Sequence, residues 1–201
     1  MSVFELQTPS GLARVDVHEA RSARAALVLG HGAAGGFAAP DLAKATEVAL
    51  AEGISVAHVE QPYRVAGRKA PAPQRQLDAA WIAVLERLRD RELNGLPVIV
   101  GGRSMGARVA CRTAASTGAF ALLCFAFPLE PPGRGGRPPQ SRLPELAAVT
   151  VPTLVVQGAR DPFGMPPAGP LRTVVEVAGD HGLRTDLPAV AAAVRAWLRS
   201  L

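Results

Sequence analysis

The feature that most constrains the fold is a repeated change of hydrophobic pattern along the chain. Short, continuous apolar runs alternate with longer segments in which apolar residues recur every three or four positions. The first pattern is typical of strands buried on both faces, and the second of helices with one buried face. Strands and helices that alternate in this way predict the α/β class, with a mostly parallel sheet flanked by helices on both faces.

The expected elements follow from these patterns. The first 20 residues are expected to supply one or two antiparallel edge strands. The segment 128–146 is rich in proline and glycine, which excludes a regular element until its last few residues. It is expected to be a surface connection at the carboxyl edge of the sheet, where ligands bind in such folds. Strands are predicted at 25–32, 54–60, 96–102, 120–127, 150–158 and 173–177, and helices at 41–52, 74–91, 104–116 and 188–198.

Length and composition indicate one globular domain over residues 1–201. The chain has 201 residues, of which 48% are hydrophobic, enough to bury a proper core. No apolar run approaches the ~18 residues that a membrane span needs. The start, "MSVFELQTPSG", lacks a basic segment followed by an apolar one, so no signal peptide is expected. Cys111 and Cys124 lie in apolar surroundings and are interpreted as buried, reduced thiols of a cytoplasmic protein.

The charge balance leaves several kinds of partner open. A net charge of +5 is compatible with nucleic acid, a membrane surface or anionic substrates. The arginines are scattered over the chain, however, and aromatic residues make up only 4% of it. A nucleic-acid binder more often clusters its basic residues or interleaves stacking aromatics. We therefore expect no nucleic-acid partner and no membrane, but a small-molecule substrate.

One short stretch carries the pattern of a nucleophile elbow. Residues 102–106 read Gly-Arg-Ser-Met-Gly and lie between a predicted buried strand and a predicted helix. In this context Gly-x-Ser-x-Gly presents the serine, here Ser104, at the top of the sheet, next to the positive end of the helix dipole. The alternative is a structural turn in which the serine only caps the helix.

A nucleophilic serine needs a base and an orienting carboxylate. In chains with a nucleophile elbow, the acidic residue follows the serine in the sequence and the histidine follows the acidic residue. His181 is the only histidine after Ser104. Asp161 directly follows a predicted strand, where the sheet can aim a carboxylate at the site. Asp180 is the competing acid, but sequence neighbours generally point apart. We predict Ser104, Asp161 and His181 as the catalytic residues.

Two backbone N–H groups should form an oxyanion hole. One would be that of Met105, and the other that of Ala33 or Ala34 in the loop "HGAAGG" at 31–36. His31 is expected to hold this loop by hydrogen bonding. The other two histidines do not pair with carboxylates or cysteines at the spacing of metal ligands, so no metal and no cofactor are predicted.

Six motifs then occur in a fixed order between residues 25 and 200. They are HGAAGG (31–36), QPYRVAGRKAPAP (61–73), GGRSMG (101–106), PLEPPGR (128–134), QGARDPFG (157–164) and GDHGL (179–183). Together they resemble the small α/β-hydrolases of the dienelactone-hydrolase-like superfamily. Within it, they resemble most a compact group of predicted hydrolases found in bacteria and with animal relatives.

This resemblance implies a minimal α/β-hydrolase fold without a lid domain, and a triad formed by Ser104, Asp161 and His181. The sequence departs from the family pattern at the second alanine of HGAAGG, where the family more often has glycine. This position lies in the loop that is expected to supply the second N–H donor of the oxyanion hole. One branch of the animal relatives resembles a subunit of a chromatin-modifying assembly. The alternative function is therefore an interaction protein on a hydrolase scaffold.

The expected reaction is acyl transfer to water from a small ester, thioester or lactone. Several basic residues lie in loops expected at the carboxyl edge of the sheet, where they could attract an anionic substrate. The alternative is that they are solvated surface residues. They are Arg68, Lys69, Arg103, Arg134 and Arg137.

Overall fold

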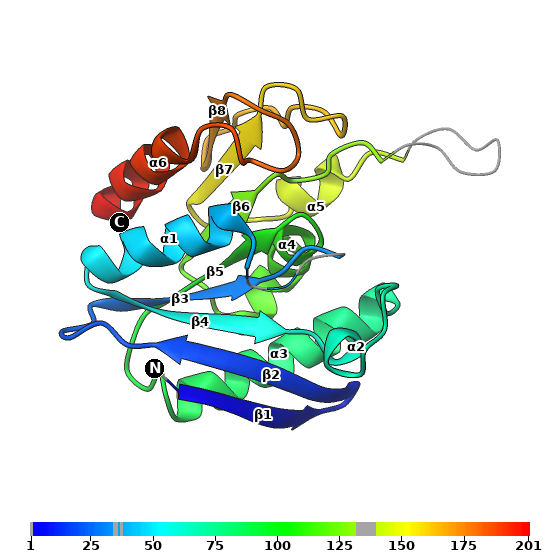
Figure 1. Ribbon diagram of the computed structural model, residues 1–201, viewed down its shortest axis with the longest axis vertical. Helices are drawn as coiled ribbons and strands as arrows, with labels where there is room; N and C mark the ends of the chain where they lie inside the picture. Colours follow the sequence, from blue (N-terminus) through cyan, green and yellow to red (C-terminus); the bar gives the residue numbers. More distant parts are fainter. Residues whose placement is uncertain (1, 34–35, 37, 132–139) are drawn as a thin grey trace.

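The computed structural model describes residues 2–33, 36, 38–131 and 140–201, and its centre is an eight-stranded sheet (Figure 1). The strand order is β1-β2-β4-β3-β5-β6-β7-β8. The strands are β1 (Ser2–Thr8), β2 (Gly11–His18), β3 (Ala25–Gly30), β4 (Ile54–Glu60), β5 (Val98–Arg103), β6 (Ala121–Phe125), β7 (Thr153–Gly158) and β8 (Arg172–Val177).

Six neighbouring strands, from β4 to β8 in the sheet order, pair in parallel. The strand β2 pairs antiparallel with β4, and β1 pairs antiparallel with β2. The predicted antiparallel strands of the first 20 residues are thus present at one edge of the sheet. Because the six parallel strands run in one direction, the loops that follow them meet at a common edge.

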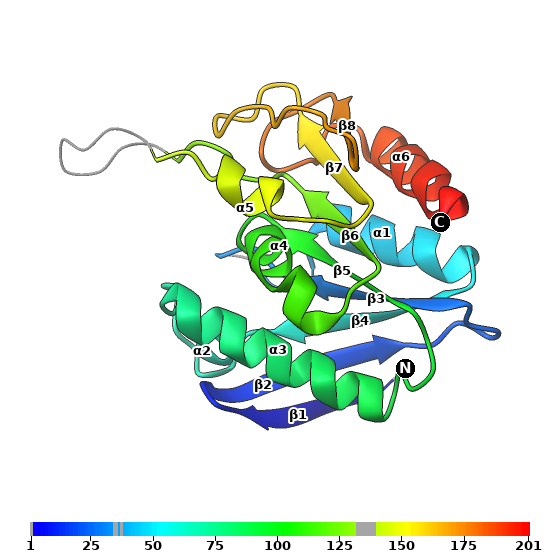
Figure 2. The same ribbon diagram turned by 180° about the vertical axis from the view of Figure 1, so that it is seen from behind.

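Helices cover both faces of the sheet. Figure 1 shows α1 (Pro40–Ala51) and α6 (Leu187–Ser200) on one face, and Figure 2 shows α3 (Gln74–Asp90) and α4 (Met105–Thr117) on the other. Two short helices, α2 (Pro62–Val65) and α5 (Leu143–Ala147), lie in connections. This arrangement confirms the predicted α/β fold class.

The sequence of β3 is apolar without interruption because both faces of the strand are buried. Its side chains alternate between the two hydrophobic cores, Ala26 and Val28 in one, Leu27 and Leu29 in the other. Each face of the strand is covered by helices, so neither face calls for a polar residue.

No helix in the described part of the chain is long and apolar enough to span a membrane.

The structure differs from the sequence-based expectation at β6 and at α2. The strand β6 ends at Phe125 rather than at Phe127, because Ala126 turns the chain with a φ of 47°. The helix α2 was not predicted, since its four residues are too few to show a helical period. The helix α5 occupies the last part of the proline-rich segment, where a regular element was still allowed. Cys111 and Cys124 are buried and unbridged, as expected.

Candidate active site

Ser104 lies at the sharp turn between β5 and α4. Its backbone has φ 51° and ψ −106°, a conformation that costs energy for a residue with a side chain. Its N–H donates to the carbonyl of Phe125 at 2.9 Å, and its own carbonyl accepts the first bond of α4 from Arg108. Its hydroxyl does not cap the helix. The cap interpretation of Ser104 therefore fails, and the strained turn presents the side chain.

The two glycines of the motif allow the close packing of this turn. A Cβ atom on Gly102 would lie 2.5 Å from the carbonyl oxygen of Gly30, and one on Gly106 would collide with the same atom. Both contacts are with backbone, which cannot move aside as a flexible side chain can. Glycine is thus required on both sides of Ser104 for the start of α4 to rest against the end of β3.

His181 follows β8 and reaches Ser104 across the carboxyl edge of the sheet. Its Nε2 lies 2.9 Å from the Oγ of Ser104, and its Nδ1 lies 2.8 Å from Oδ2 of Asp161. An ionised carboxylate can only accept, so Nδ1 carries the proton and Nε2 accepts from the serine hydroxyl. The ring of Phe163 packs against the imidazole, with the ring centroids 4.6 Å apart. The imidazole is thus held on three sides.

Asp161 follows β7, and its side chain is fully buried. Its Oδ2 accepts from Gln157 Nε2 at 2.9 Å as well as from His181, and its Oδ1 accepts from the N–H of Phe163 at 2.9 Å. Gln157 is itself buried and is fixed by Phe127, whose N–H donates to its Oε1 at 2.8 Å. The carboxylate therefore has three donors and one orientation.

The competing acid, Asp180, is exposed and bonds within its own turn. Its Oδ1 accepts from the N–H of Gly182 at 2.8 Å. Of the two candidate carboxylates, the structure brings Asp161 into contact with His181.

The loop that contains Ala33 passes beside Ser104. A Cβ atom on Gly32 would lie 3.8 Å from the Cβ of Ser104. The Nε2 of His31 accepts from the N–H of Gln61 at 3.1 Å, which leaves Nδ1 to donate to the carbonyl of Gly32 at 2.7 Å. Burial lowers the pKa of His31, which favours this neutral form. His31 thus bonds within the loop, as expected, whereas Ala34 lies outside the described residues.

Arg103 connects the turn of Ser104 with the loop of His181. Its Nε lies 3.0 Å from Oδ2 of Asp41, which is fully buried at the start of α1, and its Nη2 donates to the carbonyl of His181 at 2.6 Å. Burial raises the pKa of Asp41, and the charge of Arg103 opposes this rise. Sequence reasoning placed Arg103 among the substrate-binding candidates, but two of its donor groups face protein acceptors.

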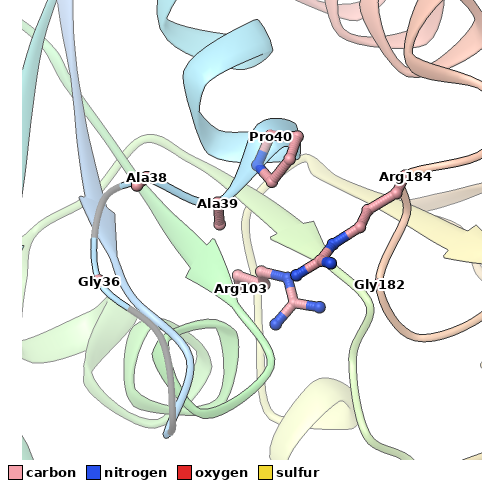
Figure 3. A pocket seen from close by; sticks show the side chains of 7 residues that line it. All are labelled: Gly36, Ala38, Ala39, Pro40, Arg103, Gly182 and Arg184. Carbon is pink, nitrogen blue, oxygen red and sulfur yellow. The ribbon is translucent and has the colours of Figure 1, made fainter.

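A pocket of about 340 Å³ lies beside these residues. Figure 3 shows that Arg103 enters it from the end of β5 and Arg184 from the loop that follows His181. The other described residues that line the pocket have small side chains or none: Gly36, Ala38, Ala39, Pro40 and Gly182. Arg184 is exposed and forms no hydrogen bond or ion pair with another described residue. Of the two charges in this pocket, Arg184 is therefore the one that the described residues leave uncompensated.

The other basic candidates are placed differently. Arg68 and Lys69 follow α2 at the same edge of the sheet and are exposed. Arg134 and Arg137 lie outside the described residues. Over the described ranges, no group of three histidine, cysteine or acidic side chains could hold a metal ion.

Comparison with known proteins places this chain in a family. A model described as the alpha/beta hydrolase domain matches residues 23–184. The chain belongs to the alpha/beta hydrolase domain family. A comparison of this hydrolase-family chain with curated proteins gives no match.

Solved structures show the same fold for this alpha/beta hydrolase domain. XC6422 from Xanthomonas campestris, described as a serine hydrolase without a lid, is 18% identical, with a TM-score of 0.78 over 99% of this chain and 94% of the other. Est1E from Butyrivibrio proteoclasticus is 14% identical, with a TM-score of 0.78 over 100% and 98%. Dienelactone hydrolase from Anabaena variabilis is 15% identical, with a TM-score of 0.78 over 99% and 96%. The predicted α/β-hydrolase fold is confirmed.

Sequence reasoning did not single out Gln157, Asp41 or Arg184. Gln157 is the first residue of the motif QGARDPFG, four residues before Asp161. Its position in that motif is the one feature of the sequence that could have pointed to a role beside Asp161. Asp41 resembles any acidic residue in the first turn of a helix. Arg184 lies three residues after His181, in a loop. Hydrophobic periodicity does not predict where the side chains of a loop point.

Proposed function

We propose that this protein is a serine hydrolase that cleaves small carboxylic esters, thioesters or lactones through an acyl-enzyme. One observation carries the proposal: the continuous chain of hydrogen bonds from Asp161 through His181 to Ser104, at 2.8 and 2.9 Å. The serine at its end stands on a strained strand-to-helix turn, which is the usual setting of an activated hydroxyl.

The reaction begins when Ser104 Oγ attacks the substrate carbonyl and gives its proton to His181 Nε2. Asp161 accepts from Nδ1 and stabilises the imidazolium that forms. The carbonyl oxygen becomes an oxyanion, which the N–H groups of Met105 and Ala33 bind. His181 then protonates the leaving oxygen or sulfur as its bond to carbon breaks. Water, deprotonated by His181, attacks the acyl-enzyme, and His181 returns the proton to Ser104 Oγ as the acid leaves.

We propose an anionic substrate, with Arg184 as the group that binds its negative charge. Of the two cations in the pocket of Figure 3, Asp41 compensates Arg103, whereas Arg184 pairs with no other residue in the part of the chain that the structure describes. A carboxylate on the acyl or leaving group would accept charge-assisted hydrogen bonds from its guanidinium. The motifs that resemble the dienelactone-hydrolase-like superfamily support a compact, single-domain enzyme with an open site, which suits small substrates.

The test is hydrolysis of short p-nitrophenyl esters by the wild type and by four variants. Ser104→Ala, His181→Ala and Asp161→Ala should each lose at least about 10³-fold in kcat. Asp180→Ala is the matched control, because its carboxylate lies in the same loop as His181 but bonds only within its turn, and it should retain activity. Wild-type activity that survives in Ser104→Ala would refute the proposal. No wild-type hydrolysis would favour the interaction-protein alternative.

A further inference from the structure

Tyr63 is the only tyrosine of the chain, and it lies in α2, directly after β4. Figure 1 shows α2 beyond the carboxyl end of β4, beside the edge where the candidate site lies. The residue is only 1% exposed, so its hydroxyl needs a partner within the protein. That partner is the carbonyl oxygen of Ala33, which accepts from the hydroxyl at 2.8 Å.

The same hydroxyl also reaches the start of α4. Its oxygen lies 3.7 Å from the Sδ of Met105, the first residue of α4. Sulfur is a weak acceptor, so the proton belongs to the shorter bond with Ala33, and the sulfur packs against the phenol. One side chain therefore contacts both residues whose N–H groups are the proposed oxyanion donors. One of these residues lies in a loop and the other at the start of α4, far apart in the sequence.

The beginning of α2 holds the Ala33 loop at two successive peptide groups. Tyr63 binds the carbonyl of Ala33, and Gln61 binds His31, which in turn donates to the carbonyl of Gly32. A peptide group is planar and its N–H points opposite to its carbonyl. Fixing the carbonyl of Gly32 therefore fixes the direction of the N–H of Ala33, and the bond from Tyr63 to the carbonyl of Ala33 anchors the other end of the same residue.

We propose that Tyr63 is a positioning residue that sets the distance between the two N–H donors of the oxyanion hole. The inference rests on the proposed function. Tyr63 does not touch the substrate in this account, and its proton stays on the bond to Ala33. Donors that are already in place when the oxyanion forms need no reorganisation, which is the source of their effect on the rate. Burial raises the pKa of Tyr63 to about 12, so the phenol stays protonated during turnover.

The first experiment compares ester hydrolysis by the wild type and Tyr63→Phe, which removes the hydroxyl and keeps the ring. We expect kcat to fall about tenfold with KM unchanged, less than the 10²- to 10³-fold loss typical of removing a donor outright. The affinity for phenylboronic acid, which forms a tetrahedral anion on an active serine, should fall by a similar factor. Thr113→Val is the matched control: it also removes a buried hydroxyl, bonded to Val109 within α4, and should lower only the melting temperature.

A Tyr63→Phe variant that keeps kcat within twofold of the wild type would overturn the inference, as would a loss confined to KM. Failure of the proposed function looks different, because then the wild type itself neither hydrolyses esters nor binds the boronic acid.

A second measurement covers the case in which Tyr63→Phe does not fold. Because the chain has one tyrosine, growth on 3-fluorotyrosine labels Tyr63 alone. The ¹⁹F resonance should shift when phenylboronic acid occupies the site of the otherwise native protein. A resonance that stays unchanged at saturating boronic acid would contradict the proposal.

Discussion

Arg103 donates from its Nη2 to the backbone carbonyl of His181 at 2.6 Å, while its Nε faces the buried carboxylate of Asp41 at 3.0 Å. The residue immediately before the proposed nucleophile thus holds the loop of the proposed base. Asp41 belongs to the first turn of α1, so Arg103 joins the end of β5, the start of α1 and the loop that follows β8.

Removing Arg103 should be costly because it leaves the carboxylate of Asp41 buried without a partner. We expect Arg103→Met to lower the free energy of unfolding by about 3–5 kcal/mol at pH 7. The pKa of Asp41 is already raised by burial and should rise further. Since an acid with a raised folded-state pKa favours folding only while it is protonated, the variant should lose stability as the pH rises through that pKa.

The double variant Asp41→Asn/Arg103→Met is the control for this prediction. It should recover most of the stability lost in Arg103→Met, as measured by chemical denaturation from pH 4 to pH 8. Equal stability of the single and double variants at pH 7 would show that Asp41 does not depend on Arg103.

Gln157 should affect activity through Asp161. In Gln157→Glu a second carboxylate would face Oδ2 of Asp161, so the two groups would compete for a proton. We expect kcat to fall by about 10²-fold near neutral pH, with an altered pH profile. Gln157→Met keeps the volume without the charge, and it should show a smaller loss of kcat with an unchanged profile shape. Identical pH profiles of the wild type and Gln157→Glu would contradict this view of Asp161.

Arg184 should distinguish anionic from neutral substrates. For the wild type, kcat/KM should be higher for mono-p-nitrophenyl succinate, which carries a carboxylate, than for the neutral acetate ester. We expect Arg184→Ala to lower the value for the anionic ester by about 10- to 100-fold, the worth of a hydrogen bond to a charged group. The neutral ester should be unaffected.

Arg160→Ala is the matched control for Arg184→Ala, because Arg160 is also exposed at a strand end and does not line the pocket. It should leave the ratio of the two substrates unchanged. An equal ratio in the wild type and Arg184→Ala would exclude Arg184 as the anion-binding group.

His58 should make the fold sensitive to acid. It is buried in β4, and burial, followed by the charge of His18, lowers its pKa from 6.5 to about 4. A base with a depressed folded-state pKa contributes stability that is present above pH 6.5 and lost as the pH falls towards 4. At 1.36 kcal/mol per unit of pKa, the loss is about 3 kcal/mol. Urea denaturation at several pH values should show a flatter dependence for His58→Gln, and an unchanged dependence would refute this role.

The sequence predicts features that depend on neighbouring residues better than it predicts contacts between segments that are far apart in the sequence. The turn at Ser104 follows from glycine spacing between two recognisable elements, which is local information. The meeting of Asp161 with His181 was also accessible, because the ends of parallel strands share one edge. The contacts of Tyr63 and Asp41 were not, because each requires knowing which side chains from separate loops face one another. Periodicity predicts that a residue is buried, but not which partner it meets.

The most direct measurement is mass spectrometry of the protein after treatment with a fluorophosphonate, which forms a covalent bond with an activated serine. We predict a single adduct on the peptide that contains Ser104, none in Ser104→Ala, and much slower formation in His181→Ala than in Asp180→Ala. Absence of the adduct from the folded wild type, or an adduct on another residue, would contradict the account of Ser104, His181 and Asp161 as a catalytic unit.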